Sequence, residues 1–383
     1  MELTPKQQVV DILRNKQKFI IFTHKSPDGD AIGSTLAVVL AMKKLGKEVT
    51  AVCNDSMPAV FNYLKEITEI KDQFKATKDF VISLNVSDIK ADKLLYKVKD
   101  NQLEIIISPK MGQFEPDMVT FPEGGFGYDA VICLDSTDLE RLGEVYEKNA
   151  ELFYSLPLVN IDHHSGNTHF GKINLIDMTA TSTSEILVSV FEAMTGDPKF
   201  IDEPIATSLL TGIIADTNSF QNANTTPKSL TVAAQLVASG GRQQDIIKNI
   251  YKTKTLSTLR LWGRALSNLH DEMAYKFVWS ELRKRDFAEV SATEDESGGL
   301  IDELLKTASG ANFALLLSEK SGEVHGSLRS SVPSIDVAEI AKLFGGGGHM
   351  MAAAFQMPDK TLSAAAIEII RKIKSYLKEN NRI

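Results

Sequence analysis

Histidine and aspartate side chains occur in four short segments of the chain, and each segment ends an apolar run. The segments are THKSPDGD (23–30), LDSTD (134–138), IDHH (161–164) and IIADTNSF (213–220). In a parallel sheet, the loops that follow the strands meet at one edge, where ligands bind. The first three segments follow predicted strands and should therefore converge. The fourth ends a helical pattern, so the strand argument does not place it.

Convergence would bring several ionisable side chains into one crevice. Carboxylates that lie close together repel, and some should take up a proton unless cations neutralise them. Carboxylates mixed with imidazole suit Mn²⁺, and Mg²⁺ is the alternative. Two ions bridged by one aspartate would activate water and hold a phosphoryl oxygen, without a further cofactor. The side chains concerned are His24, Asp28, Asp30, Asp135, Asp162, His163, His164 and Asp216.

Each segment taken alone also has an ordinary structural explanation. PDGD is a common turn sequence, and two adjacent histidines after a strand are usually incidental. However, three of only seven histidines in the chain fall within these segments. Their joint occurrence favours a metal-dependent phosphoesterase over four unrelated loops.

The elements that would position these segments follow an α/β pattern. Apolar strands alternate with amphipathic helices in the first part of the chain, which predicts a mostly parallel sheet. Strands are predicted at 18–23, 48–53, 129–134 and 156–161, and helices at 30–45, 186–194, 204–215 and 230–238.

The pattern divides the chain into two domains. We predict a first domain at residues 1–242, a Lys- and Arg-rich helical linker at 243–271, and a smaller α/β domain at 272–383. A less regular insertion at about 75–127 interrupts the first domain. Its apolar runs FVISLNV (80–86) and LEIIISP (103–109) predict two extra strands, which could form a β-hairpin, and it carries no identifiable chemistry.

The composition limits the compartment and the substrate. The chain has 383 residues, 43% hydrophobic and 24% charged, with no apolar run of the roughly 18 residues that a membrane span requires. The N-terminus has no apolar signal core, and Cys53 and Cys133 lie in apolar runs, so we expect a cytoplasmic protein with reduced thiols. The net charge of −8 gives no basic footprint for long nucleic acid, which favours short substrates.

A glycine run in the second domain is the other candidate binding feature. GGGGH (345–349) follows the helical pattern DVAEIAKLF, although one glycine would cap that helix. Four glycines allow close backbone approach to a ligand, with N–H groups directed at an anion. Arg329 lies in a nearby segment and could hold a phosphate with two N–H groups. The alternative is a flexible loop beside a surface arginine.

Three of these motifs together resemble a known family. HKSPDGDAIGS (24–34), the DHH at 162–164 and GGGGHMMAAAF (345–355) are similar to the signatures of the DHH/DHHA1 phosphoesterases. The resemblance runs from about residue 18 to 355, in the family's order. It is strongest to the bacterial oligoribonuclease and 3′-phosphoadenosine-5′-phosphate (pAp) phosphatase type, the nanoRNases. The departures are Lys25–Ser26, Ala354 and the longer stretch at 75–127, which bears on substrate access.

The resemblance implies two domains, DHH and DHHA1, and a role for each candidate residue. It places the fourth acidic segment with the other three. One metal ion would be held by His24, Asp28 and Asp135, and the other by Asp30, Asp135, His163 and Asp216, so that Asp135 bridges them. Asp162 would orient a ligand histidine, and His164 would contact the scissile phosphate or protonate the leaving oxygen. The substrate contacts in the second domain would be Arg329, Gly346, Gly347, Gly348 and His349. The two domains would then form the walls of a cleft.

The resemblance implies hydrolysis of short oligoribonucleotides, or of small nucleotides such as pAp or linear dinucleotides. A cyclic di-AMP phosphodiesterase and a RecJ-like single-strand exonuclease are the alternatives; RecJ-like enzymes usually carry additional nucleic-acid-binding domains. Pyrophosphatases share the first domain but lack the GGGGH motif. A nucleotide-binding regulator with an inactive site is disfavoured, because every expected ligand is present. No membrane partner is expected, and a homodimer is compatible with the family.

Overall fold

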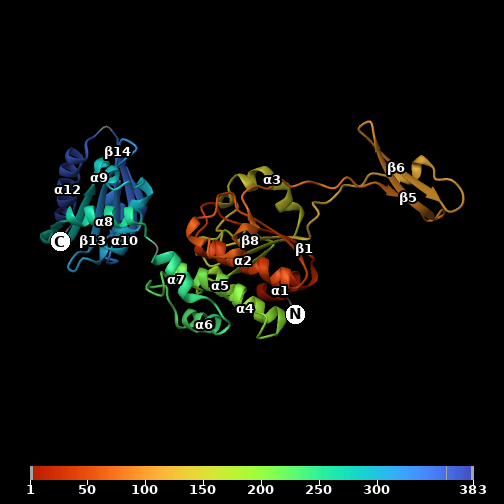
Figure 1. Cartoon of the computed structure of the whole chain (residues 1–383), viewed down its shortest axis with the longest axis horizontal. Helices are drawn as coiled ribbons and strands as arrows, with labels where there is room; N and C mark the ends of the chain where they lie inside the picture. Colours follow the sequence, from red (N-terminus) through yellow and green to blue (C-terminus); the bar gives the residue numbers. More distant parts are fainter. Residues whose placement is uncertain (1–2, 253, 359, 381–383) are drawn as a thin grey trace. The chain divides into compact units, whose positions relative to one another are not determined.

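The structure is a computed structural model that describes residues 3–252, 254–358 and 360–380 (Figure 1). The chain divides into two compact units, Met1–Lys252 and Thr253–Ile383. No helix among the described residues has both the length and the apolar character that crossing a membrane would require.

The first unit is built on a six-stranded sheet in which all paired strands are parallel, as the sequence predicts. The strand order is β10-β9-β8-β1-β2-β3, so β1 and β8 lie side by side at the centre. All four predicted strands are present, with small shifts at their ends. The strands are β1 (Lys18–Thr23), β2 (Glu48–Val52), β3 (Ile70–Lys71), β8 (Ala130–Leu134), β9 (Leu158–Asp162) and β10 (Ile173–Ile176).

Helices cover this sheet and carry part of the site. Two of them, α2 (Gly29–Lys44) and α5 (Glu203–Asp216), cross so closely that a Cβ on Gly33 would lie 2.9 Å from the Gly212 backbone nitrogen. Only glycine allows this approach. The helices of the first unit are α1 (Pro5–Asn15), α2 (Gly29–Lys44), α3 (Glu144–Ser155), α4 (Thr183–Thr195), α5 (Glu203–Asp216), α6 (Pro227–Ala238) and α7 (Gln243–Tyr251).

The insertion contains a β-hairpin, but only one of its two strands is a strand that the sequence predicts. β6 (Gln102–Pro109) matches the predicted strand LEIIISP, whereas its partner is β5 (Ala91–Lys99). Only Ser83–Leu84 of the other predicted run is a strand (β4), and it pairs with β7 (Val119–Thr120). The two residues between β5 and β6, Asp100 and Asn101, both have positive φ. They form the tight turn that suits a hairpin, which fixes the pairing.

The second unit contains a mixed six-stranded sheet with helices on both faces. The strand order is β11-β12-β13-β14-β16-β15. α11 and α12 cover one face, and α8, α9 and α10 cover the other. The strands are β11 (His270–Glu272), β12 (Phe277–Leu282), β13 (Phe313–Lys320), β14 (Glu323–Ser330), β15 (Gly347–His349) and β16 (Ala352–Met357). The helices are α8 (Leu256–Ser267), α9 (Lys284–Glu289), α10 (Leu300–Glu303), α11 (Val337–Lys342) and α12 (Leu362–Glu379).

The segment at 243–271 contains two helices that belong to different units. Ile246 of α7 is buried in the core of the first unit, and Leu261 and Trp262 of α8 are buried in the second. The apolar side of each helix therefore packs within its own unit, and the division between the units falls between them.

Candidate metal centre

His24 comes directly after β1 at the carboxyl edge of the sheet, and it is 4% exposed. Its Nδ1 lies 2.8 Å from the carbonyl oxygen of Lys25. Because a carbonyl only accepts hydrogen bonds, Nδ1 carries a proton, and Nε2 is the nitrogen that faces the acidic side chains. Nε2 lies 3.6 Å from Asp135 Oδ2 and 4.0 Å from Asp28 Oδ1. Nε2 is therefore the His24 nitrogen that could bind a metal ion.

Two aspartates are held at the start of α2. Asp28 caps the helix, and its Oδ1 accepts hydrogen bonds from the backbone N–H groups of Asp30 (3.0 Å) and Ala31 (3.1 Å). The Asp30 carboxylate is fully buried and accepts hydrogen bonds from the backbone N–H groups of Thr183 (2.6 Å) and Ser184 (3.0 Å). The first turn of α4 therefore holds a carboxylate that belongs to α2.

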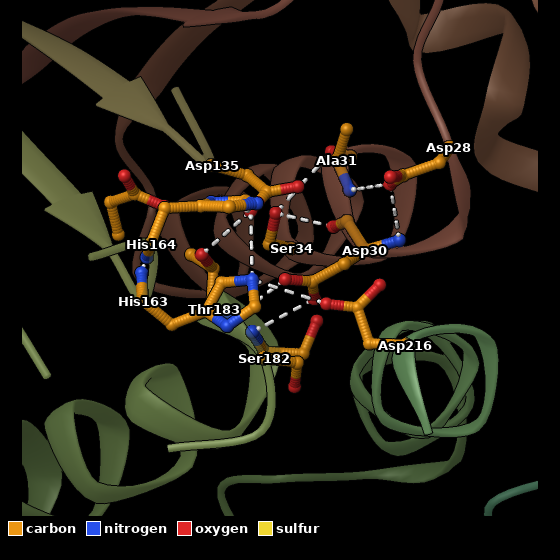
Figure 2. Close-up of polar contacts among 12 residues, drawn as sticks. Asp28, Asp30, Ala31, Ser34, Asp135, His163, His164, Ser182, Thr183 and Asp216 are labelled. Atoms are coloured by element: carbon orange, nitrogen blue, oxygen red, sulfur yellow. Dashed lines mark hydrogen bonds and ion pairs between the residues drawn. The ribbon is translucent and has the colours of Figure 1, made fainter. Parts of the chain in front are cut away.

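Asp135 follows β8, next to β1 in the sheet, and is 2% exposed. Its φ of 55° lies in the left-handed region, which is uncommon for a residue other than glycine and is typical of strained positions near functional sites. The hydroxyl of Thr183 donates a hydrogen bond to Asp135 Oδ1 at 3.1 Å. Thr183 thus contacts both buried aspartates, one through its backbone and one through its side chain (Figure 2).

The Asp–His–His segment ends β9, and its first residue is fully buried. Asp162 Oδ1 lies 2.8 Å from both the backbone N of His163 and the Nδ1 of His164, and Oδ2 accepts from Asn167 at 2.7 Å. Burial is the largest single effect and raises the pKa of Asp162. The hydrogen bonds from His164 and Asn167 act in the opposite direction, and the resulting pKa lies below its usual value. Asp162 is therefore an ionised carboxylate that orients His164.

His164 is the most exposed imidazole of this group, with 45% of its side chain exposed. Its Nδ1 lies next to the Asp162 carboxylate, so Nε2 is the nitrogen that a ligand could contact. The same hydrogen bond raises the pKa of His164, with the charge of Asp135 adding to it against the effect of burial. A protonated Nε2 can donate a proton or a hydrogen bond to a ligand.

Asp216 is the last residue of α5, and the close crossing of α5 with α2 brings it to the same place. His163 Nε2 lies 3.1 Å from Asp216 Oδ2 and 3.6 Å from Asp135 Oδ1. That nitrogen is buried and has no hydrogen-bond partner in the described part of the chain. The fourth acidic segment therefore joins the other three through helix packing, not through a strand.

These side chains fit divalent cations. Burial, together with the charges of Asp135 and Asp216, raises the pKa of Asp30 well above its usual value. Burial also raises the pKa of Asp216 to about 9, with the charges of Asp135 and Asp28 adding to it. Such crowding is relieved by cations that all the carboxylates share. Ligand atoms within 4.8 Å of one another form three overlapping groups: His24, Asp28 and Asp135; Asp30, His163 and Asp216; and Asp135, Asp162, His163 and His164.

The predicted substrate contacts lie in the second unit. Arg329 on β14 pairs with Ala352 on β16, and Ala352 pairs with His349 on β15. Directly paired residues point to the same face of a sheet, so Arg329 and His349 lie on one face, two strands or about 10 Å apart, with a small residue between them. The Arg329 Nε donates to both carboxylate oxygens of Asp302, at 3.0 and 3.1 Å.

The glycine run differs from the expectation of free backbone N–H groups. The N–H groups of Gly345 and Gly346 donate to carbonyl oxygens of α11, those of Lys342 and Ala341. A Cβ on Gly346 would lie 2.2 Å from the Ala354 carbonyl oxygen, and Gly348 has a φ of 144°. These glycines therefore end α11 and let β15 approach β16. Gly347 is the one glycine of 346–348 with open space at its Cβ position.

Sequence reasoning missed the start of α4 and the residue Asn167. Thr183 and Ser184 carry no charge and do not follow a strand, so they did not stand out. A signal was present, because Ser182 and Glu185 form the Ser-x-x-Glu pattern that starts many helices, and a helix N-terminus binds anions. Asn167 has no such signal; its contact with Asp162 depends on how the loop after β9 folds.

Comparison with protein families identifies both parts of the chain. Residues 18–213 match the model of the DHH family, N-terminal domain, and residues 272–379 match the DHHA1 domain. The chain belongs to the DHH family of phosphoesterases. The resemblance seen in the sequence is thereby confirmed, and so is the prediction of a hydrolase that acts on phosphate esters.

Two curated relatives and one solved structure extend the comparison. The bifunctional oligoribonuclease and PAP phosphatase NrnA of Thermus thermophilus is 26% identical over 93% of this chain and 89% of its own. The cyclic-di-AMP phosphodiesterase PdeA of Listeria monocytogenes is 23% identical over 97% of this chain but 50% of its own. An exopolyphosphatase-related protein from Bacteroides fragilis superposes with a TM-score of 0.75 at 20% identity, covering 99% and 98% of the two chains, which shows a shared fold.

The crowded carboxyls predict how pH affects the metal-free protein. In the unfolded chain Asp216 loses its proton near pH 4, whereas in the folded chain its pKa is about 9. Between these values the folded state binds more protons, so stability should fall as pH rises. Metal ions displace those protons, so their stabilising effect should grow with pH. Melting temperatures from pH 5 to 9, in chelator and in Mn²⁺, test this; a metal effect that is constant across that range would contradict it.

Thr183 offers a second test, because its two contacts can be separated. Thr183→Val keeps the shape and the backbone N–H to Asp30 but removes the hydroxyl that orients Asp135. We expect bound metal or activity to fall about tenfold or more, as when other groups that orient metal ligands are removed. Thr195→Val, at the far end of α4, removes a hydroxyl bonded to the Phe191 carbonyl and serves as the control. Equal effects of the two substitutions on metal affinity would exclude the role given to Thr183.

Proposed function

We propose that the protein is a two-metal phosphoesterase that hydrolyses short oligoribonucleotides, or small nucleotides such as pAp or linear dinucleotides. The observation that carries this proposal is the overlap of the ligand groups. Asp135 is common to two of them, and His163 is also common to two. Two cation positions that share a carboxylate are the arrangement that phosphate-ester hydrolysis by two metals requires.

The ligand assignment follows the distances within the cluster. One ion would be held by His24, Asp28 and Asp135, which form one complete group. The other would be held by Asp30, His163 and Asp216, with Asp135 as the shared ligand, because its Oδ1 lies 3.6 Å from His163 Nε2. Bound ions, for which we propose Mn²⁺ with Mg²⁺ as the alternative, would supply an activated water and neutralise the charge on the phosphoryl oxygens.

His164 is the proposed proton donor or phosphate contact. Its Nδ1 is fixed by Asp162 at 2.8 Å, and 45% of its side chain is exposed, so a ligand can reach Nε2. Its raised pKa keeps more of the protonated form near neutral pH than a free histidine would have. Asp162 orients His164 and thereby determines which nitrogen is available.

The whole-length match supports the substrate class. The match covers 89% of the Thermus thermophilus oligoribonuclease and PAP phosphatase and 50% of the Listeria monocytogenes cyclic-di-AMP phosphodiesterase. The net charge of −8 gives a long polyanion little attraction to the rest of the surface. Hydrolysis of cyclic di-AMP is the second candidate, because that relative matches 97% of this chain.

A cytoplasmic location remains a prediction.

The second unit is proposed to contact the substrate. Arg329 and His349 share one face of its sheet, with Ala352 between them. Among the described hydrogen bonds of the Arg329 guanidinium, Nε donates to the Asp302 carboxylate and Nη1 donates to the Leu328 carbonyl. An incoming phosphate would have to compete with, or share, this ion pair. Gly347 offers the open backbone beside His349, whereas Gly346 and Gly348 act by allowing the tight path of the chain.

Replacing the shared ligand tests the two-metal proposal. Asp135→Ala should abolish activity, by about a thousandfold or more, and lower the bound metal, because both ions lose a ligand. Asp28→Ala, which removes a ligand of one ion, should have a smaller effect. Asp138→Ala is the matched control, since Asp138 lies in the same loop but bonds Thr137 and Arg141 instead. Normal metal content and normal rate in the Asp135 variant would show that the ligand assignment is wrong.

A substrate panel with Mn²⁺ tests the substrate class. We expect RNA of about two to five nucleotides to be cleaved at least tenfold faster than RNA of about twenty, because a net charge of −8 gives a long polyanion little attraction. The panel also contains pAp, linear and cyclic di-adenylate, and pyrophosphate. Preference for cyclic di-adenylate would favour the second candidate, and equal or faster cleavage of long RNA or single-stranded DNA would favour an exonuclease.

The same panel tests the part played by Arg329. Arg329→Ala should raise KM for the preferred substrate and leave the bound metal unchanged, since a phosphate contact is lost and no ligand is touched. Arg371→Ala is the control, because Arg371 is an exposed arginine of α12, on the other face of the same sheet. A KM that is unchanged by Arg329→Ala would remove this residue from the substrate site.

A further inference from the structure

The hairpin of the insertion has one apolar face that the other described residues of the first unit leave largely exposed. In β5 and β6, three cross-strand pairs are directly opposed: Leu94 with Ile107, Tyr96 with Ile105, and Val98 with Leu103. Because side chains alternate along a strand, all six point to the same face of the hairpin. The other face is mostly polar, with Lys93, Lys97, Lys99, Gln102, Glu104 and Ser108.

The exposure of this apolar face is unusual. Leu94, Tyr96 and Val98 are 70–76% exposed, and Leu103 is 61% exposed. Ile105 is 43% exposed, and Ile107 is partly buried. Together the six side chains present on the order of 600 Å², at the upper limit of what a monomer usually leaves in one patch. A two-stranded hairpin is also marginally stable without a second layer on its apolar face. The hairpin therefore lacks the layer that would stabilise it.

We propose that this face packs against the same face of a second copy of the chain, so that the two hairpins form the core of a homodimer. The face carries no charge that would select a charged partner. Its surface, doubled, would bury about 1,200 Å² in total, which reaches the lower end of specific protein interfaces.

The order of the pairs makes the face complementary to itself. Tyr96 and Ile105 form the middle pair, and an aliphatic pair of similar size lies on each side of it. A two-fold axis along the middle pair would place Leu94 and Ile107 of one copy over Val98 and Leu103 of the other. Aliphatic residues would then meet aliphatic residues, and Tyr96 would lie near its own counterpart. Such a self-complementary contact is what a two-fold interface requires.

Molar mass in solution tests the proposal. The full-length protein should be a dimer at micromolar concentration, and Tyr96→Ser combined with Val98→Ser should weaken dimerisation about a hundredfold or more, because each substitution counts twice at the interface. Leu95→Ser is the matched control, since Leu95 is 55% exposed on the same strand but points to the other face. Melting temperature and bound metal report whether the rest of each variant is folded. A monomeric wild-type protein, or a dimer that the double substitution leaves intact, would overturn the proposal.

Chemical crosslinking gives a second test that does not depend on weakening the interface. The two natural cysteines, Cys53 and Cys133, are buried, so an introduced cysteine on the hairpin is the reactive thiol. Stacked sheets lie about 10 Å apart, so a thiol crosslinker of that span should join two copies of the Tyr96→Cys variant. The Leu95→Cys variant should not be joined, because its thiol faces away from the partner. Crosslinking of both variants, or of neither, would contradict the proposed face.

Discussion

The buried Asp30 carboxylate holds the first unit's site together. It belongs to the first turn of α2, it accepts two hydrogen bonds from the start of α4, and it lies against α5, where a Cβ on Gly212 would stand 2.2 Å from its Oδ1. One fully buried carboxyl group thus contacts three helices. Burying a carboxylate is costly unless it is bonded and neutralised. The N–H groups at the start of α4 supply hydrogen bonds to the carboxylate. The neighbouring acids supply no positive charge, so cations would have to neutralise it.

This arrangement explains why the cluster is both strained and ordered. Asp135 adopts a left-handed backbone conformation, and the pKa values of Asp30 and Asp216 are raised by burial and by neighbouring charge. A protein tolerates such features where function requires them. Uncharged neighbours stabilise these acids through hydrogen bonds: Thr183 donates to two of them, and Asn167 donates to Asp162. Residues outside the candidate ligand set therefore help to position the candidate metal ligands.

The two units differ in how directly their sequence motifs relate to a ligand. In the first unit the acidic and histidine segments come together at one edge of the sheet (Figure 2). In the second unit most of the glycine run serves the backbone: Gly345 and Gly346 end α11, and Gly348 shapes β15. Arg329 and His349 lie on one face of that sheet, and the substrate contact proposed for the second unit rests on these two side chains rather than on the glycines.

The sequence alone determined the family, the parallel sheet, and the set of acidic and histidine residues, because these depend on local patterns: strand periodicity and the residues at strand ends. Only the tertiary structure decided how Asp216 reaches the cluster, since this depends on the crossing of α2 and α5 at Gly33 and Gly212. It likewise decided that Thr183 holds two aspartates, and that β5 pairs with β6 to form one apolar face. Contacts between distant segments arise from packing and pairing, which a local pattern does not record.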